Sequence, residues 1–97
     1  MRVVNTKIIE DYGDGHADVA GQLSSWLAIA KSSSWKHSAD VKSKNPNAYP
    51  IGNKRVIFHI KGNNYRLVVR INYEIGLVEI RWVGTHKEYD SINAEAI

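Results

Sequence analysis

Residues 55–83 read RVIFHIKGNNYRLVVRINYEIGLVEIRWV, which are three apolar runs separated by two short polar segments. Within each run apolar and polar residues alternate, and this period of two predicts β-strands at residues 55–60, 65–72 and 77–83. Both connecting segments contain glycine, and one contains two asparagines, residues that favour tight turns. The three strands are therefore predicted to form an antiparallel meander.

The alternation also assigns side chains to the two faces of the predicted sheet. One face is expected to be apolar and to pack on a helix, and it carries Val56, Phe58, Ile60, Leu67, Val69, Val78 and Ile80, with Trp82 following on the same side. The opposite face is expected to be a planar cationic surface formed by Arg55, His59, Arg66, Arg70, Glu79 and Arg81. Arginine is suited to bidentate phosphate contacts, although such charges can also serve only to keep a small sheet soluble.

The N-terminal part of the chain is predicted to contain a strand and a short helix. Residues 2–6 are partly β-branched and favour a strand. The pattern of residues 6–12 favours a helix, with Thr6 as a candidate N-cap. Gly13 and Gly15 are expected to end this helix.

A longer helix is predicted from His16 to about Lys31, because apolar residues recur there at the 3.6-residue helical period. The following residues 35–53 are polar and contain two prolines, so a long loop with one helical turn at 38–42 is expected. A strand and helices followed by a meander predict a small α+β domain.

Length and composition fit this fold class. Ninety-seven residues, 43% of them hydrophobic and 24% charged, are expected to form one globular domain spanning residues 1–97. No run approaches the length of a membrane span, and Lys7, Glu10 and Asp11 lie where the apolar part of a signal peptide would be. A cytoplasmic protein without membrane association is therefore expected.

Positive charge is concentrated in the C-terminal half. Residues 1–53 carry a formal net charge of +1, residues 54–89 carry +4, and residues 90–97 carry −2. Charge gathered in one region predicts a polyanionic partner, either a nucleic acid or a strongly acidic protein.

Two segments carry a resemblance to a known family. Residues 55–67, RVIFHIKGNNYRL, resemble the RVVFNIKGNKYRL motif of the HigB family of toxins, which belongs to the RelE-like superfamily. Residues 81–90, RWVGTHKEYD, resemble the GTHxEYD motif that closes the same family's sequences. The resemblance extends over nearly the whole chain, and the two motifs together are specific.

The resemblance implies a fold, an activity and partners. The implied fold is RelE-like, similar to microbial RNases, with a curved antiparallel sheet and helices on one side. The implied activity is metal-independent cleavage of mRNA, either on the ribosome or on free mRNA, by the toxin of a type II toxin–antitoxin pair. The implied partners are mRNA, a helix-turn-helix antitoxin and, only through that antitoxin, operator DNA. No cofactor and no metal are expected.

The motifs also supply candidate catalytic residues. RNA cleavage by the neighbouring 2′-hydroxyl needs a proton acceptor, a cation for the developing negative charge, and a proton donor. Arg66 and His86 match the motif arginine and histidine, and Tyr89 lies three residues after His86, on the same side only if the segment is helical. Arg66 could instead pair with Glu79 across the sheet, and Tyr89 could be a core aromatic residue.

His59 departs from the family pattern, which commonly has asparagine there. It could add a second titrating group, or it could simply replace one polar side chain by another. A metal site formed by His59, His86 and Asp90 is a weak alternative, because no ligand spacing supports it.

The predicted contacts with the RNA backbone are all basic residues of the C-terminal half, namely Lys54, Arg55, Lys61, Arg70, Arg81 and Lys87. The same residues would serve the main alternative, a module that binds RNA or the ribosome without cleaving. The two functions differ in whether RNA is cut.

Overall fold

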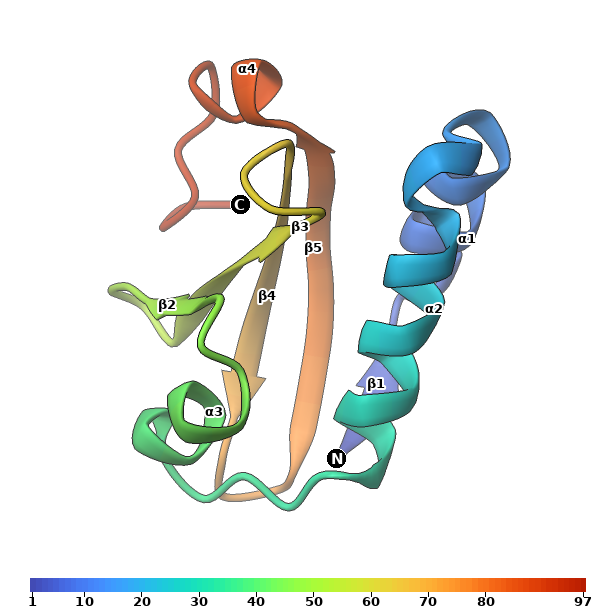
Figure 1. The fold of residues 1–97 in the computed structure, drawn as a ribbon. Helices are drawn as coiled ribbons and strands as arrows, with labels where there is room; N and C mark the ends of the chain where they lie inside the picture. Colours follow the sequence, from blue (N-terminus) through green and yellow to red (C-terminus); the bar gives the residue numbers. More distant parts are fainter.

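The computed structural model describes residues 1–97 and contains five strands and four helices (Figure 1). In chain order these are β1 (Arg2–Val4), α1 (Lys7–Gly15), α2 (Ala17–Ser32), α3 (Ser38–Lys44), β2 (Ala48–Pro50), β3 (Arg55–Ile60), β4 (Tyr65–Asn72), β5 (Leu77–Thr85) and α4 (His86–Tyr89). The predicted α+β fold is confirmed. None of the helices is long and apolar enough to cross a membrane.

The strands form one sheet in the order β1-β5-β4-β3-β2. Neighbours from β2 to β5 are antiparallel, so the predicted meander is confirmed, and β3 and β4 have the predicted bounds. The expectation of a purely antiparallel sheet is wrong, because β1 pairs with β5 in parallel. β2 was not predicted; it is a three-residue edge strand, where Pro50 removes no central hydrogen bond.

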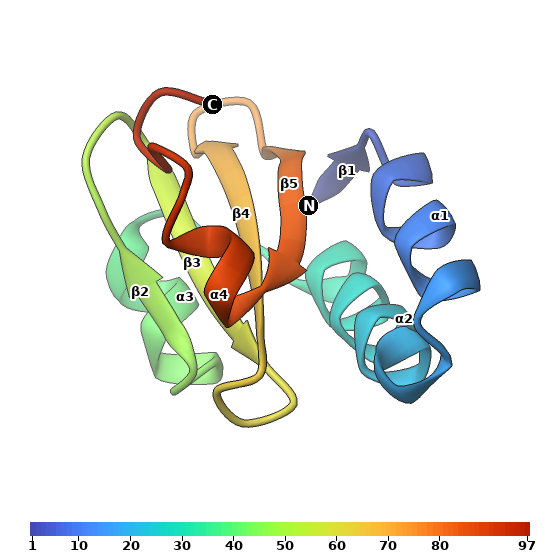
Figure 2. The same cartoon turned by 90° about the horizontal axis from the view of Figure 1, so that it is seen from above.

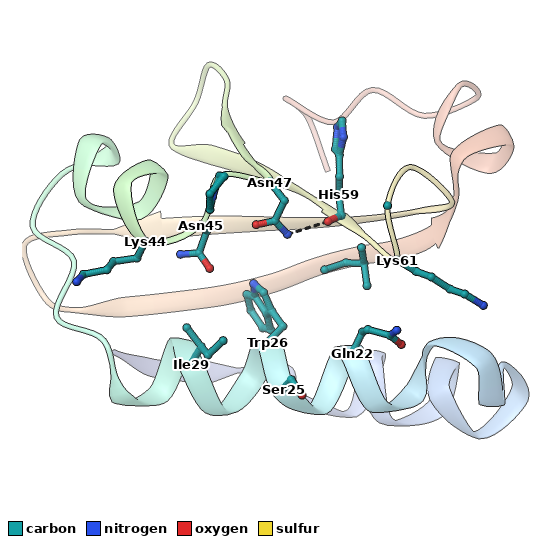
Figure 3. Close-up of a pocket in the computed structure, with 12 residues that line it drawn as sticks. Gln22, Ser25, Trp26, Ile29, Lys44, Asn45, Asn47, His59 and Lys61 are labelled. Atoms are coloured by element: carbon teal, nitrogen blue, oxygen red, sulfur yellow. Dashed lines mark hydrogen bonds between the residues drawn. The ribbon is translucent and has the colours of Figure 1, made fainter.

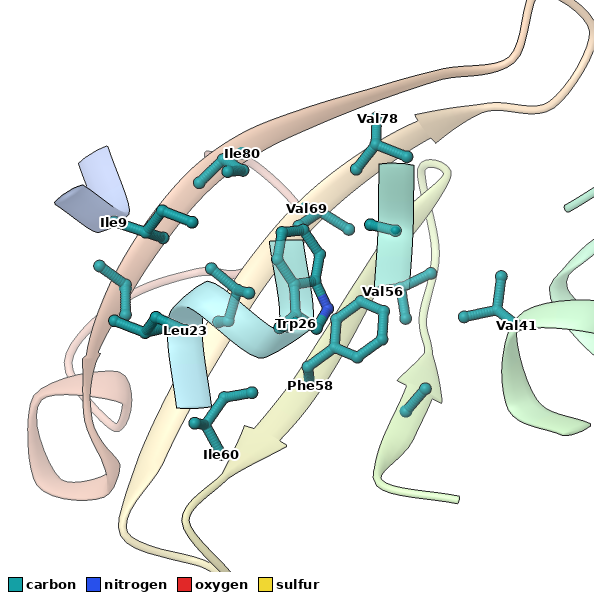
Figure 4. Close-up of a cluster of buried hydrophobic side chains, with 14 of the residues drawn as sticks. Ile9, Leu23, Trp26, Val41, Val56, Phe58, Ile60, Val69, Val78 and Ile80 are labelled. Carbon is teal, nitrogen blue, oxygen red and sulfur yellow. The ribbon is translucent and has the colours of Figure 1, made fainter. Parts of the chain in front are cut away.

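The main hydrophobic core lies between α2 and one face of the sheet (Figure 4). The predicted helical period is confirmed, because Val19, Leu23, Trp26 and Ala30 of α2 are buried. The Trp26 ring meets Phe58 of β3 edge to face, with 5.3 Å between ring centroids. Figure 4 shows both rings among aliphatic side chains of β3, β4 and β5.

α1 continues through Gly13 and ends at Gly15, so the expected helix end is wrong at Gly13 and confirmed at Gly15. Gly13 is buried where α1 packs on α2, and a Cβ there would lie 3.3 Å from the Cβ of Ala20. The glycine therefore allows close helix packing. The helical turn expected at 38–42 is the longer helix α3.

An irregularity in β5 changes the face on which Trp82 lies. Val69 pairs with Ile80 but Val68 pairs with Trp82, so Arg81 is an extra residue in β5. The bulge reverses the alternation, and Trp82 packs with Val68 on the face opposite the main core. The expectation that Trp82 shares a side with Ile80 is wrong for this reason.

The second face of the sheet is not the open cationic surface that the alternation predicted. Its centre is a small apolar cluster of Ile57, Val68 and Ala94, against which the C-terminal segment packs. Figure 2 shows this segment and α4 lying on the side of the sheet away from α1 and α2. The arginines of this face are therefore separated into different local environments.

Candidate active site

Arg66 and His86 lie in contact at the end of the sheet where β5 leads into α4. An Nη2–H of Arg66 donates to Nδ1 of His86 at 2.6 Å, and Nη1 donates to the carbonyl oxygen of Asn63 at 2.9 Å. Arginine can only donate, so Nδ1 is the acceptor and the ring proton is on Nε2. The structure thus brings together two residues that are 20 positions apart in the sequence.

Arg66 is the only charged side chain among the buried residues and is 5% exposed. Its hydrogen-bond partners are neutral, namely carbonyl oxygens and the His86 ring. The alternative pairing with Glu79 is not formed, since Arg66 pairs with Gly84 in the β4–β5 register and Glu79 instead contacts Arg70 and Arg81. A buried guanidinium without a carboxylate partner is costly unless an anion binds to it.

Local backbone structure fixes the position of His86. The Thr85 hydroxyl accepts a hydrogen bond from the Glu88 amide at 3.1 Å, and the Glu88 carboxylate accepts from the Thr85 amide at 2.8 Å. This capping box starts α4 at His86. The His86 amide also donates to the Asn64 carbonyl at 2.9 Å, which ties α4 to the β3–β4 turn.

His59 also lies beside Arg66, although it was not among the predicted catalytic residues. It pairs with Arg66 in the β3–β4 register, and its ring centroid lies 4.3 Å from that of Tyr49. Burial lowers the pKa of His59, and the neighbouring charge of Arg66 lowers it further. His59 is therefore held neutral and able to accept a proton. The β3–β4 pairing was the signal in the sequence that could have placed it beside Arg66.

Tyr89 lies in the helical segment α4, which settles the choice between helical and extended backbone. The Cζ of Arg66 is 5.9 Å from the centroid of the half-buried Tyr89 ring. The Trp82 ring is also near Tyr89, with 6.2 Å between ring centroids. Tyr89 thus packs against the apolar cluster and also lies near the guanidinium of Arg66. Together with His59, these residues form what we call the Arg66 cluster: His59, Arg66, His86 and Tyr89.

The basic residues predicted to bind RNA are divided between two ends of the sheet. Lys61 and Lys87 lie in the turn after β3 and in α4, at the same end as the Arg66 cluster. Arg55 and Arg70 pair with each other in register, four residues or about 13 Å along the strands from His59 and Arg66. Lys54 precedes Arg55 at that distant end.

Several of these cations also have protein partners. Arg55 donates to backbone oxygens of Asn53 and Ile97, and Lys61 lies 3.1 Å from the Asp18 carboxylate. Arg70 and Arg81 share Glu79, at 3.2 and 3.5 Å. Lys87 is exposed and forms no ion pair.

Aromatic residues connect this end of the sheet to the helices on the main-core face. The rings of Tyr12 and His16 stack with 3.9 Å between centroids, and Tyr65 meets both edge to face. The Tyr65 hydroxyl donates to Asp18 at 2.7 Å. Burial, together with the nearby Glu88 carboxylate, raises the pKa of Tyr12 to about 12. These residues hold α1 and α2 against the strand ends that carry the Arg66 cluster.

The Arg66 cluster combines one fixed positive charge, one neutral imidazole that can accept a proton, and further proton donors. No group of three histidine or acidic side chains lies close enough to hold a metal ion, so His59, His86 and Asp90 do not form a ligand set. The cluster fits an anionic ligand with a transferable proton, such as a phosphodiester beside a hydroxyl.

One known protein family matches most of the chain. The model of the HigB toxin family, the RelE-like toxic component of a toxin–antitoxin system, matches residues 19–92. The chain belongs to this family. The match contains every residue of the Arg66 cluster. Membership of the HigB family, which the two C-terminal motifs indicated, is confirmed. None of the curated proteins compared with the chain matches it. As a HigB-family toxin, the chain has a cognate antitoxin as its partner.

Proposed function

We propose that this toxin is a metal-independent mRNA endoribonuclease that acts on the ribosome and is inhibited by a helix-turn-helix antitoxin encoded beside it. Operator DNA would be bound only through that antitoxin. The observation that carries the proposal is the buried guanidinium of Arg66, which has neutral partners and no carboxylate. A phosphodiester supplies the anion that this environment lacks.

The proposed reaction is attack of an RNA 2′-hydroxyl on the adjacent phosphorus. The 2′-oxygen forms a bond to phosphorus, the bond from phosphorus to the 5′-oxygen breaks, and a cyclic phosphate and a 5′-hydroxyl result. His59 takes the proton of the 2′-hydroxyl, because it is held neutral beside Arg66. Tyr89 supplies a proton to the leaving 5′-oxygen.

Arg66 and His86 stabilise the negative charge that builds up on the phosphorane. The guanidinium supplies a permanent charge, and the hydrogen bond at Nδ1 leaves the Nε2–H of His86 as a donor for a phosphate oxygen. Lys61 and Lys87 hold the RNA nearest the scissile phosphate. Lys54, Arg55, Arg70 and Arg81 contact flanking RNA farther along the sheet.

The proposal is tested by inducing expression of the chain alone and mapping the ends of cellular mRNA. We expect growth arrest and new cuts inside translated messages. Arg66→Lys retains the charge but loses the planar fork and the contact with His86, so cleavage should fall by about 100-fold. His86→Ala should cause a comparable loss.

Arg2→Lys is the matched control, because Arg2 is exposed on the short edge strand β1 and lies outside the Arg66 cluster. It should arrest growth as strongly as the parent protein. Folded Arg66→Lys and His86→Ala proteins that cut mRNA at the parental rate would refute the catalytic assignment. RNA binding by the parent protein without any cuts would favour the non-catalytic module instead.

A further inference from the structure

A polar cleft lies on the main-core face of the molecule, with a volume of about 530 Å³. Residues of α2 form one wall, and the segment between α3 and β2 together with the end of β3 forms the other (Figure 3). Cavities of this size hold small organic ligands. Its lining is Gln22, Ser25, Trp26, Ile29, Lys44, Asn45, Pro46, Asn47, His59, Ile60, Lys61 and Gly62.

The lining of the cleft is rich in basic and hydrogen-bonding groups and lacks acidic ones. It contains two lysines, three side-chain amides and a serine hydroxyl, and it contains no carboxylate. Figure 3 shows Lys44 and Lys61 at opposite ends of the cleft. Lys61 contacts Asp18, whereas Lys44 forms no ion pair. The cleft is therefore suited to a ligand that has hydrogen-bonding edges and a negative charge.

A hydrogen-bond donor without a partner lies buried beneath the floor of the cleft. Trp26 is 5% exposed, and its indole Nε1–H is buried without an acceptor. In Figure 3 the indole nitrogen points toward the loop that carries Asn45. The Asn45 side chain is itself held by a hydrogen bond from Nδ2 to the Val41 carbonyl. A buried donor without a partner is unfavourable, and an acceptor on a ligand would satisfy it after a small shift of the lining side chains.

The cleft is connected to the Arg66 cluster by the end of β3 and the following turn. The backbone of His59 lines the cleft, whereas Figure 3 shows its ring pointing to the other side of the strand. Gly62 lines the cleft, and the next residue, Asn63, accepts a hydrogen bond from Arg66. An extended strand of RNA could therefore pass around this turn from one site to the other.

We propose that this cleft is a nucleotide-binding subsite, which holds one nucleotide of the RNA strand that flanks the scissile phosphate. A base places its acceptor atoms toward Trp26 and the amides, and Lys44 contacts the phosphate. The identification of the strand as RNA substrate rests on the proposed function, but binding of a nucleotide to the cleft does not.

The test is a titration of the full chain with adenosine 5′-monophosphate and, separately, with uridine 5′-monophosphate. These probes contain no phosphodiester and cannot be cleaved. The readout is the NMR signal of each tryptophan indole N–H, and a Trp26→Phe variant assigns the Trp26 signal. We expect that signal to move in a saturable way at concentrations up to about 20 mM, while the Trp82 signal stays unchanged.

Lys44→Glu keeps an exposed position polar and should weaken nucleotide binding by about tenfold, because it replaces an attractive charge by a repulsive one. Lys31→Glu is the matched control, since Lys31 is also exposed but does not line the cleft. It should leave the titration unchanged. A Trp26 signal that stays fixed, or equal affinities of both variants, would overturn the inference.

Arg66→Lys separates this inference from the proposed function. It should abolish most RNA cleavage and leave the titration of the Trp26 signal intact. If the parent protein cuts no RNA but binds the nucleotide at Trp26, the proposed function fails and the subsite stands. If it cuts RNA and the Trp26 signal does not respond, the subsite fails and the proposed function stands.

Discussion

The two histidines of the Arg66 cluster have different surroundings because of where each ring lies. Nδ1 of His86 is occupied by the guanidinium of Arg66, whereas His59 lies across the β3–β4 pair in a setting that keeps it neutral. Buried Arg66 links the two rings, since its guanidinium donates a hydrogen bond to His86 and its charge lowers the pKa of His59. Substitution of His59 and substitution of His86 should therefore affect different steps of the proposed reaction.

The lowered pKa of His59 predicts a pH dependence of stability. In the unfolded chain the histidine takes up a proton near pH 6.5, before the folded protein does. The unfolded state thus binds more protons in this range, so the free energy of unfolding should decrease as the pH falls from about 7 through the folded-state pKa of His59.

The measurement is chemical denaturation of the parent protein and of His59→Asn between pH 5 and 8. The difference between the two free energies isolates His59 from the other histidines. As the pH falls, the free energy of unfolding of the parent protein should decrease relative to that of His59→Asn. A difference that is constant with pH would contradict the shifted pKa.

At the scale of elements, the bulge in β5 and the start of α4 determine how the cluster is assembled. The bulge turns Trp82 toward Val68, and Gly84 leaves room for its ring. A Cβ at Gly84 would collide with the indole of Trp82 and would also approach Glu88 Oε1 to 3.0 Å. The absence of a side chain at Gly84 thus matters for packing, since its backbone angles are accessible to other residues.

Gly84→Ala is expected to lower the free energy of unfolding by about 1–3 kcal/mol, because the rigid Trp82 ring must move. Gly21→Ala is the matched control: Gly21 is exposed within α2, and a Cβ there meets no atom within 4 Å. It should raise stability by about 0.5–1 kcal/mol through helix propensity. Equal effects of the two substitutions in urea denaturation would contradict this account.

The capping box of α4 is expected to matter for both stability and activity. Thr85→Ala removes the acceptor of the Glu88 amide, which should cost about 1 kcal/mol in denaturation and loosen the backbone of His86. RNA cleavage should fall as well. Thr6→Ala is the control, because the Thr6 side chain makes no capping hydrogen bond to α1. A Thr85→Ala protein with parental stability and cleavage would show that the box does not position His86.

At the scale of the whole molecule, the number of basic residues predicted to bind RNA is larger than the number without protein partners. Glu79, Asp18 and the Ile97 backbone contact four of the six cations predicted to bind RNA. Lys87 remains exposed beside the Arg66 cluster and without an ion pair. Its contribution to RNA affinity should therefore be larger than its share of the net charge.

The salt dependence of RNA binding tests this distribution. On single-stranded RNA, Lys87→Gln should reduce the slope of log K against log salt by about 0.7, as expected for one lost phosphate contact. Lys31→Gln removes an exposed lysine from the end of α2 and should leave the slope unchanged. A binding assay over a series of salt concentrations, in the His86→Ala background to prevent cleavage, distinguishes the two variants. Equal slopes for both would contradict a local phosphate contact at Lys87.

The sequence alone determined the features that depend on local periodicity. The bounds of β3 and β4 follow from their alternation, and α2 follows from its 3.6-residue pattern, because each pattern reports which face of an element is buried. The two C-terminal motifs identified the HigB family, and they contain Arg66 and His86. These features are encoded within short segments of the chain.

Only the tertiary structure decided the features that depend on contacts between distant segments. The parallel pairing of β1, the bulge that redirects Trp82 and the covering of the second sheet face involve partners that no local pattern specifies. The same holds for the burial of Arg66 against His86 and for the place of His59 beside them. A side chain's charge is written in the sequence, whereas its desolvation and its partners depend on the packing of the whole chain.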